Sequence, residues 1–171
     1  SLFSGIGAIE QAFQKLKYDY EISFASDNDK FVKQSYFANY KISENKWFDD
    51  VKKIDGKKFK YKIDIIVGGA PCQPFSMVGK RGGLADTRGT LFYDFARIVK
   101  DSRPKIFIYE NVKGLLSLQK GNTFQTILKA FQDLNYDIHY SLLNAKDFGV
   151  PQNRERLFLI GFRNKYNFFF S

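Results

Sequence analysis

The 171-residue chain is poor in the residues that several common classes of protein depend on. A single cysteine excludes a disulfide framework and a multi-cysteine zinc site. A single histidine removes the usual histidine-rich metal sites, so we expect no metal. No stretch approaches the roughly 18 consecutive apolar residues of a membrane span, and no secretory signal opens the chain. We therefore expect a cytoplasmic protein whose chemistry comes from other side chains.

The composition fits one folded domain with a basic surface. Hydrophobic residues make up 44% of the chain and charged residues 26%, which is enough for a packed core. Lys and Arg number 27 against 18 Asp and Glu, so the net charge is +9. A charge of this size indicates either a solvated surface or a polyanionic partner. Much of the excess lies in the lysine-rich run 52–62, and by itself that run favours the solvated surface.

Neither end of the sequence has the form of a domain boundary. The chain opens on Ser1-Leu2-Phe3 without Met, at the end of an apparent strand, and closes on Phe168-Phe169-Phe170-Ser171 directly after another strand-like stretch. No internal repeat and no linker divides it. We therefore expect residues 1–171 to be part of a longer protein.

Strand and helix patterns alternate along the chain. Strands are predicted at Leu2–Phe3, Glu21–Ala25, Ile63–Val67, Lys105–Tyr109, Ile138–Leu143 and Leu157–Phe162. Helices are predicted at Ile6–Lys17, with Ile6, Ile9, Phe13 and Leu16 on one face, and at Lys30–Tyr40, Thr90–Asp101 and Thr123–Leu134. This alternation predicts an α/β fold with a mostly parallel sheet and helices on both faces. Ligands of such sheets bind outside the carboxyl ends of the strands.

The first strand–helix turn, Gly5-Ile6-Gly7, has the form of a ligand-binding turn. Its glycines let backbone approach a ligand, and Asp27 follows 20 positions after Gly7, where a carboxylate could accept from ribose hydroxyls. Glu10 stands where a dinucleotide site needs a small residue, and a carboxylate there would repel a pyrophosphate. The turn therefore favours a nucleoside without phosphates, such as S-adenosylmethionine. A glycine pair in a tight turn is often purely structural, and Phe3 is either core or a platform for adenine.

Cys72 and Glu110 follow two different buried strands and so should emerge at the same edge of the sheet. A lone Cys is usually an inert core residue, but Cys72 lies in a loop between two prolines with Lys and Arg nearby, which favours an exposed thiolate. Glu110 ends an apolar strand and needs a partner or a function. A partly desolvated carboxyl group can stay protonated and donate a proton to a substrate.

Together these groups suggest one reaction. A thiolate adds to carbon 6 of a pyrimidine, protonation of the ring nitrogen lets electron density collect at carbon 5, and that carbon attacks a methyl sulfonium. Thiol–disulfide chemistry is the alternative, but it normally requires a second Cys.

Two further segments carry cations toward the same edge. The loop 71–89 holds four glycines, which suit the hinge of a lid, and Lys80, Arg81 and Arg88, which suit phosphates. Disorder is the competing interpretation of this loop. Alternation at period two puts Gln152, Arg154 and Arg156 on one side of the last strand, where the guanidinium groups serve either ligand contact or a structural salt bridge.

Five motifs in this order resemble the DNA cytosine-5 methyltransferase family of bacterial restriction–modification systems. They are Leu2-Phe3-Ser4-Gly5-Ile6-Gly7, Pro71-Cys72-Gln73 followed by Phe75-Ser76, Arg88-Gly89-Thr90-Leu91-Phe92, Glu110-Asn111-Val112, and Gln152 with Arg154 and Arg156. The resemblance covers essentially the whole chain, and the combination is far more specific than any single motif.

The resemblance implies a Rossmann-like methyltransferase fold, S-adenosylmethionine as cofactor and double-stranded DNA as partner. The cofactor site would comprise Phe3, Gly5, Gly7, Asp27, Asp50, Val51 and Leu91. Cys72 would be the nucleophile and Glu110 the group at the ring nitrogen, with Arg154 and Arg156 steadying a cytosine flipped out of the duplex. The expected DNA contacts are Ser76, Lys80, Arg81, Arg88 and Gln152.

The sequence departs from the family pattern in two ways. Ser1 stands where many members have Asp, and residues 1–171 hold neither the target-recognition region nor the final glycine-containing motif. We therefore expect a fragment of the catalytic domain. A tRNA cytosine methyltransferase and a non-catalytic nucleotide- or nucleic-acid-binding module remain alternatives, whereas Glu10 disfavours a nicotinamide oxidoreductase.

Overall fold

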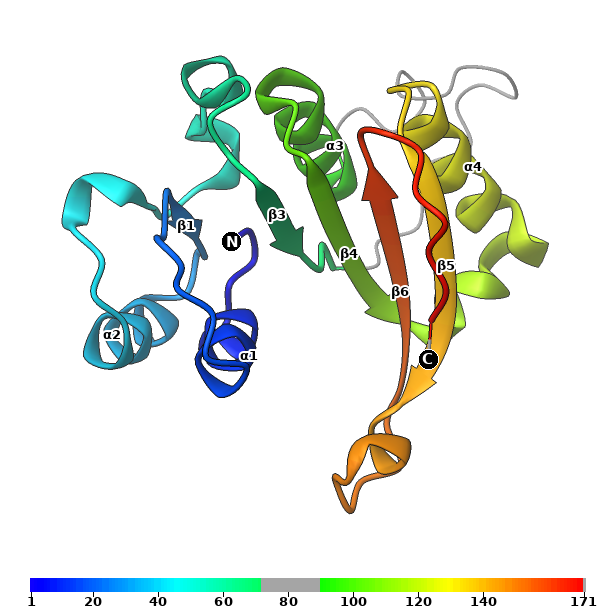
Figure 1. Ribbon diagram of the computed structural model, residues 1–171, viewed down its shortest axis with the longest axis horizontal. Helices are drawn as coiled ribbons and strands as arrows, with labels where there is room; N and C mark the ends of the chain where they lie inside the picture. Colours follow the sequence, from blue (N-terminus) through cyan, green and yellow to red (C-terminus); the bar gives the residue numbers. More distant parts are fainter. Residues whose placement is uncertain (72–89, 171) are drawn as a thin grey trace.

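Strands and helices alternate in the computed structural model, which describes residues 1–71 and 90–170 (Figure 1). The α-helices are α1 (Ala8–Lys15), α2 (Lys30–Asn39), α3 (Leu91–Ser102) and α4 (Asn122–Gln132). The strands are β1 (Ala25–Ser26), β2 (Trp47–Phe48), β3 (Ile65–Gly68), β4 (Ile106–Val112), β5 (Asp137–Asn144) and β6 (Glu155–Phe162). Short 3₁₀ turns include η2 (Val51–Lys53), η3 (Gly56–Phe59), η5 (Lys113–Leu116) and η7 (Ala145–Phe148). No helix in the described ranges is long and apolar enough to cross a membrane.

The sheet runs β2-β1, then the single residue Leu2, then β3-β4-β6-β5. Leu2 forms parallel bridges to Ser26 on one side and Gly68 on the other, which joins the two groups of strands. The pairs β1–β2 and β3–β4 are parallel, whereas β6 pairs antiparallel with both β4 and β5. The prediction of a mostly parallel sheet is confirmed, with β6 as the reversed strand.

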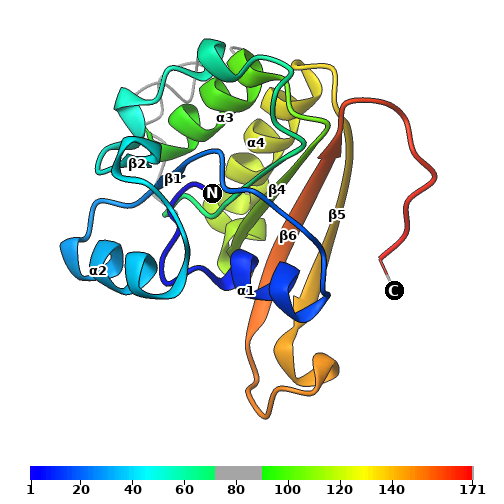
Figure 2. The ribbon, with the colours of Figure 1, turned by 60° about the vertical axis from the view of Figure 1, so that its left-hand side comes forward.

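Helices lie on both faces of this sheet, as predicted. Figures 1 and 2 show α3 and α4 together on one face, with α1 and α2 on the other side. The α3–α4 face is held by aromatic side chains: Phe107 of β4 lies with its ring centroid 4.3 Å from that of Phe131 and 6.1 Å from that of Phe95. All three are fully buried, and burying each such side chain contributes about 1.5–3 kcal/mol. This packing fixes the position of β4 and its carboxyl end.

Helix α1 half-buries Ile9 and Phe13 of the predicted apolar face, whereas Ile6 and Leu16 lie just outside the helix and are 68% and 64% exposed. The most buried residue of α1 is Glu10, which is 5% exposed. The reason is a hydrogen bond of 2.7 Å from the hydroxyl of Tyr36, in α2, to Glu10 Oε1. The carboxyl group thus turns into the interior, so repulsion of a pyrophosphate by Glu10 does not describe this turn.

The strands near the beginning of the chain also differ from the prediction. The predicted strand Glu21–Ala25 reduces to β1, at Ala25–Ser26, and the short strand β2 beside it was not predicted. In β2, Trp47 is buried against Tyr36, with ring centroids 5.3 Å apart. Two residues do not establish a period of alternation, so β2 gives no sequence signal. The remaining strands and helices match their predicted ranges to within a few residues.

Candidate active site

A cleft of about 620 Å³ opens at the edge of the sheet where β3 and β4 end. Because β6 is antiparallel, its first residues lie at this same edge, and Arg156 faces Val112 at the end of β4. The cleft is lined by Ser1, Leu2, Phe3, Ser4, Ala8, Ile9, Val67, Gly68, Gly69, Glu110, Leu143, Asn144, Ala145, Phe148, Val150, Arg154, Arg156 and Phe158. Four predicted site residues, Phe3, Glu110, Arg154 and Arg156, are thus brought together from three parts of the sequence.

The charged pair of the cleft is Glu110 and Arg156. Arg156 Nε lies 2.9 Å from Glu110 Oε1, and the two side chains are 23% and 34% exposed. Arg156 also donates from a terminal nitrogen to the carbonyl of Glu155, which fixes the plane of the guanidinium group. Glu110 therefore has the partner that a carboxyl group at the end of an apolar strand requires. The pair leaves Glu110 Oε2 as a further acceptor beside the cleft.

The close approach of Glu110 to β3 depends on Gly69. A Cβ atom on Gly69 would lie 2.7 Å from Glu110 Oε2 and 3.0 Å from the Glu110 carbonyl oxygen. Real Cβ atoms essentially never show the shorter distance, so any side chain here would displace the carboxylate. The sequence pattern Gly68-Gly69 carries no signal for which of the two glycines is indispensable.

Asn111 ties the beginning of the 71–89 segment to β4. Its amide nitrogen donates to the carbonyl of Ala70 and to the Tyr109 hydroxyl, each at 3.0 Å, and its side chain is buried. Ala70 lies two positions before Cys72. Asn111 thus couples the position of Glu110 to the end of the β3 segment. Asn111 belongs to the Glu110-Asn111-Val112 motif, but the motif alone does not indicate this tether.

The basic segment 152–156 lies partly in the cleft and partly at the surface. Arg154 lines the cleft, and its backbone is held by a hydrogen bond of 3.1 Å from its N–H to Asn144 Oδ1. Gln152 is exposed and is absent from the cleft lining. The predicted alternation fails for Gln152 because β6 begins at Glu155, so the extended periodicity does not reach back to it.

The glycine turn has the backbone conformation that its sequence predicts. Gly5 and Gly7 have φ values of +53° and +83°, a region that favours glycine. Gly5 N–H donates to Asp27 Oδ2 at 3.0 Å, and the Tyr40 hydroxyl donates to the Gly7 carbonyl at 2.6 Å. A Cβ on Gly5 would meet nothing within 4 Å, so the turn faces open space. Asp27 and Tyr40 therefore hold the turn from the β1 side and from the end of α2.

Like Gly5, Gly7 and Asp27, the remaining predicted cofactor residues lie outside the cleft lining. Asp50 caps η2 by accepting from Lys52 N–H at 2.9 Å, which turns the chain just past β2. Val51 is 5% exposed, and its carbonyl accepts from Arg97 at 3.2 Å. Leu91 is the first residue of α3 and packs against the core. The structure thus gives these residues structural contacts, and their contact with a cofactor stays a prediction.

Several predicted site residues fall outside the described part of the chain: Cys72, Ser76, Lys80, Arg81 and Arg88. Within residues 1–71 and 90–170, no group of three or more His, Cys, Asp or Glu side chains is placed to hold a metal ion.

Comparison with known proteins matches the chain to a family model. Residues 1–170 match the model described as C-5 cytosine-specific DNA methylase. The chain is 48% identical over 163 residues to the orphan methyltransferase M.SPRI of Bacillus phage SPR, covering 95% of this chain and 37% of that protein. It is 46% identical over 164 residues to the type II methyltransferase M1.ScrFI of Lactococcus lactis subsp. cremoris, covering 96% of this chain and 41% of that protein.

Solved structures show the same fold. A Spodoptera frugiperda DNMT2 variant superposes with a TM-score of 0.76 at 25% identity, covering 99% of this chain and 51% of that one. The Dnmt2 methyltransferase of S. pombe also gives a TM-score of 0.76, at 21% identity, with coverage of 98% and 51%. The sheet with its reversed strand thus has the Rossmann-like fold of these methyltransferase structures.

Within that class the assignment is specific. The chain belongs to the C-5 cytosine-specific DNA methylase family. It spans about a third to a half of the length of the curated relatives that it matches.

Proposed function

We propose that the full-length protein transfers a methyl group from S-adenosylmethionine to carbon 5 of a cytosine in double-stranded DNA. The observation that carries this proposal is the convergence of Phe3, Glu110, Arg154 and Arg156 on one cleft, with Glu110 and Arg156 paired at 2.9 Å. An acid and a guanidinium group at this spacing suit a planar, polar base better than an apolar ligand. Membership of the family supports the choice of cytosine.

The residues of the glycine turn fit S-adenosylmethionine. A Cβ atom on Gly5 would meet nothing within 4 Å, so the space beside Gly5 is open to a ligand. Phe3, half-buried at the cleft, can lie against an adenine ring, and Asp27 holds the turn near the ribose position. Gly5, Gly7, Asp50, Val51 and Leu91 complete the proposed cofactor site. When bound, S-adenosylmethionine supplies an electrophilic methyl group.

The proposed chemistry begins at Cys72. Its thiolate forms a bond to carbon 6 of the cytosine, while Glu110 holds or donates the proton at ring nitrogen 3 so that the electron pair collects at carbon 5. Carbon 5 is methylated; loss of its proton and departure of the sulfur then restore the ring. Every bond that Cys72 makes is thus broken again, and the enzyme returns unchanged.

Arg156 and Arg154 have separate proposed tasks in this reaction. Arg156 contacts Glu110 directly, so it fixes the carboxyl group while its proton moves. Arg154 lines the cleft with an exposed side chain, and its guanidinium group is proposed to bind the base carbonyl. Ser76, Lys80, Arg81, Arg88 and Gln152 are proposed DNA contacts, and a flipped base is the arrangement that gives these groups access to the ring.

The first test is covalent trapping on the full-length protein. Duplex DNA carrying 5-fluorocytosine, incubated with S-adenosylmethionine, should form an adduct that survives denaturing electrophoresis, because fluorine blocks the final proton loss. Cys72→Ser should abolish this adduct. An adduct that persists in Cys72→Ser would remove Cys72 from the mechanism.

A matched pair of carboxylate variants tests Glu110. Glu110→Gln should lower the rate of labelled methyl transfer about 10²–10⁴-fold, the usual contribution of a positioned acid or base. Glu155→Gln is the control, because Glu155 is in the same region, pairs with Lys113 and does not line the cleft. Equal rates in the two variants would contradict the role of Glu110.

The choice of substrate is tested in the same assay. Transfer to tRNA without transfer to duplex DNA would support the RNA methyltransferase, and binding of DNA without transfer to either would support a non-catalytic module. DNA affinity should also fall steeply with salt if the +9 charge contacts phosphates.

A further inference from the structure

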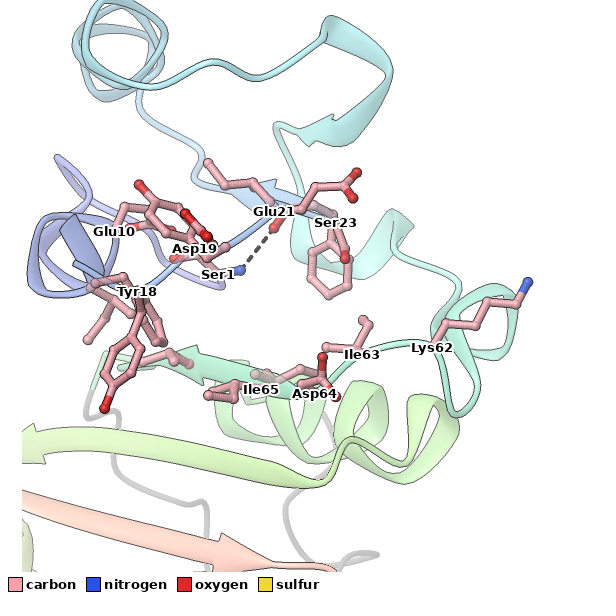
Figure 3. A pocket seen from close by; sticks show the side chains of 17 residues that line it. Ser1, Glu10, Tyr18, Asp19, Glu21, Ser23, Lys62, Ile63, Asp64 and Ile65 are labelled. Atoms are coloured by element: carbon pink, nitrogen blue, oxygen red, sulfur yellow. Dashed lines mark hydrogen bonds between the residues drawn. The ribbon is translucent and has the colours of Figure 1, made fainter. Parts of the chain in front are cut away.

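The substrate cleft does not account for the lysine-rich run 52–62, because no lysine of this run lines it. The part from Lys57 to Lys62 covers η3 and the stretch leading into β3, and all of its lysines are exposed. Figure 3 shows Lys62 pointing away from Ile63, at the outer end of a cavity of about 580 Å³. Within residues 1–71 and 90–170, these lysines form no ion pair, so the described chain does not neutralise their charge.

Folding brings further cations to the same place from α3 and β6. η3 packs against the last turn of α3, where a Cβ atom on Gly56 would lie 2.8 Å from Asp101 Cβ. Lys100 is exposed in that turn, and Arg103 follows it as the C-cap residue of α3. Arg163, directly after β6, donates from its guanidinium group to the Arg103 carbonyl at 2.8 Å. We call the resulting surface the basic rim and define it by Lys57, Lys60, Lys62, Lys100, Arg103 and Arg163.

Few carboxylates oppose the basic rim. Asp64 is paired with Lys105 at 2.6 Å, so these two residues add no net charge. Asp55 caps η3 by accepting from the Lys57 N–H at 3.1 Å, and Asp101 lies in the last turn of α3. Two carboxylates thus stand against the six cations that define the surface, and the basic rim keeps an excess of positive charge.

Aromatic rings hold the cations of the basic rim in place. Tyr61 is 63% exposed, and its ring centroid lies 5.5 Å from Lys60 Nζ and 5.2 Å from the guanidinium carbon of Arg163. Arg103 lies in the same way over the ring of the buried Tyr136, at 4.9 Å. Side chains that are already ordered lose less conformational freedom when they bind an anion. The rings therefore preorganise these cations for a negatively charged partner.

Two residues at the basic rim have a strained backbone. Tyr61 and Arg103 have φ values of +60° and +52°, in the left-handed region that residues other than glycine seldom adopt. They lie close together, because the Tyr61 N–H donates to the Ser102 carbonyl at 2.8 Å. Such a conformation costs about 1–2 kcal/mol per residue, and strain of this kind clusters at functional sites. Neither residue lines the substrate cleft, so methyl transfer does not explain the strain.

The basic rim and the substrate cleft lie at opposite edges of the sheet. Figure 1 shows the segment before β3, the beginning of β4 and the end of β6 at one edge, and η7 at the other. β4 covers Ile106–Val112, which at about 3.3 Å per residue separates the two edges by roughly 20 Å. A straight duplex that delivers a base to the cleft therefore does not extend to the basic rim.

We propose that the basic rim binds the phosphate backbone of a second segment of double-stranded DNA while a first segment occupies the cleft. The choice of DNA as the polyanion rests on the proposed function. Duplex phosphates fit this surface better than unpaired bases, because unpaired bases stack on free aromatic rings and the Tyr61 ring already contacts Lys60 and Arg163. Phosphate contacts carry no sequence information, so the basic rim holds DNA of any sequence and lets the enzyme pass between segments during its search.

The number of short duplexes that the full-length protein binds tests the proposal without catalysis. Duplexes of about one helical turn made only of A·T pairs contain no cytosine, and sedimentation equilibrium counts how many bind. We expect two per protein molecule. Lys60→Gln combined with Lys62→Gln should weaken the second binding step at least fivefold. The slope of log affinity against log salt for this step should fall by about 1.8, because each phosphate contact contributes about 0.9.

Lys15→Gln combined with Lys41→Gln is the matched control. It removes two exposed lysines outside the basic rim that form no ion pair with any residue of the described ranges. Both binding steps should stay within twofold in this control. One duplex per molecule of the unsubstituted protein, or an equal loss in both double variants, would overturn the proposal. Weaker binding to anionic phospholipid vesicles in Lys60→Gln with Lys62→Gln, with both DNA steps unchanged, would assign the surface to a membrane and would also overturn it.

The rate of methyl transfer separates this proposal from the proposed function. At saturating duplex DNA, Lys60→Gln with Lys62→Gln should stay within twofold of the unsubstituted protein, because neither lysine lines the cleft. Two binding steps without methyl transfer by the unsubstituted protein would refute the proposed function and support the second site. Methyl transfer with a single binding step would support the proposed function and refute the second site.

Discussion

Replacing Gly69 with alanine should impair catalysis while leaving the fold intact. The added methyl group would stand 2.7 Å from Glu110 Oε2, whereas ordinary van der Waals contact begins at 3.4 Å. The carboxylate must therefore retreat by about 0.7 Å, or rotate away from Arg156. A misplacement of about 1 Å costs as much as 10²-fold in rate when reacting groups must be aligned.

The expected result is a tenfold to hundredfold loss of methyl transfer in the full-length protein, or about 1.4–2.7 kcal/mol of barrier. Single-turnover transfer of a labelled methyl group to duplex DNA measures this loss without interference from product release. Stability should change little, because Gly69 does not have a positive φ and alanine restricts the unfolded chain more than glycine does.

Gly114→Ala provides the matched control. Gly114 also follows the apolar core of β4, and a Cβ there would meet nothing within 4 Å. The rate of methyl transfer by Gly114→Ala should stay within twofold of the rate of the unsubstituted protein. If Gly69→Ala also stays within twofold, the inference that Gly69 sets the position of Glu110 is refuted.

Three further changes have expected outcomes. Tyr40→Phe removes the 2.6 Å hydrogen bond to the Gly7 carbonyl and should lower the free energy of unfolding by about 1 kcal/mol. Binding of S-adenosylmethionine, measured by calorimetric titration, should be several-fold weaker. Arg97→Met leaves the buried carboxylate of Asp94 without its ion pair and should lower the free energy of unfolding by about 3–5 kcal/mol in urea. Burial raises the pKa of Tyr136 from 10.0 to about 12. The stabilisation of the fold by the neutral Tyr136 side chain is therefore complete below pH 10 and is lost as pH rises through 12. In Tyr136→Phe, the urea midpoint should fall less between pH 10 and 12 than in the unsubstituted protein.

The first two of these changes have controls on the surface. Tyr166→Phe alters a tyrosine that is 58% exposed and should not change cofactor binding. Lys129→Met breaks an exposed pair with Asp133 and should cost no more than about 0.5 kcal/mol. Comparable losses in a variant and its control would indicate a general effect of substitution rather than the stated contact.

The sequence predicted the parts of the fold in which apolar residues recur at regular spacing. The run Ile63–Val67 and the helix that follows Thr90 were found because apolar residues recur there over many positions. The burial of Glu10 in α1 was not predicted, because it depends on a hydrogen bond with Tyr36, 26 positions away, and no local pattern reveals such a partner. β2 was missed because it is two residues long.

The residues of the site could be predicted from the sequence, but the contacts between them could not. Glu110 and Arg156 were both expected at one edge, but their direct contact follows from the register of β4 against the reversed β6, which spans more than 40 positions of sequence. Gly69 acts through its close approach to Glu110, and Asn111 acts through its hydrogen bond to the Ala70 carbonyl. Both contacts join residues about 40 positions apart, so the linear sequence does not show them.

The reversal of β6 places its two ends at opposite rims of the sheet. The strand begins beside Glu110 and carries the chain about 27 Å to the far rim, where Arg163 N–H bonds to the Lys105 carbonyl. The Glu110–Arg156 ion pair and the Arg163–Lys105 backbone bond thus hold the same strand against β4 from its two ends.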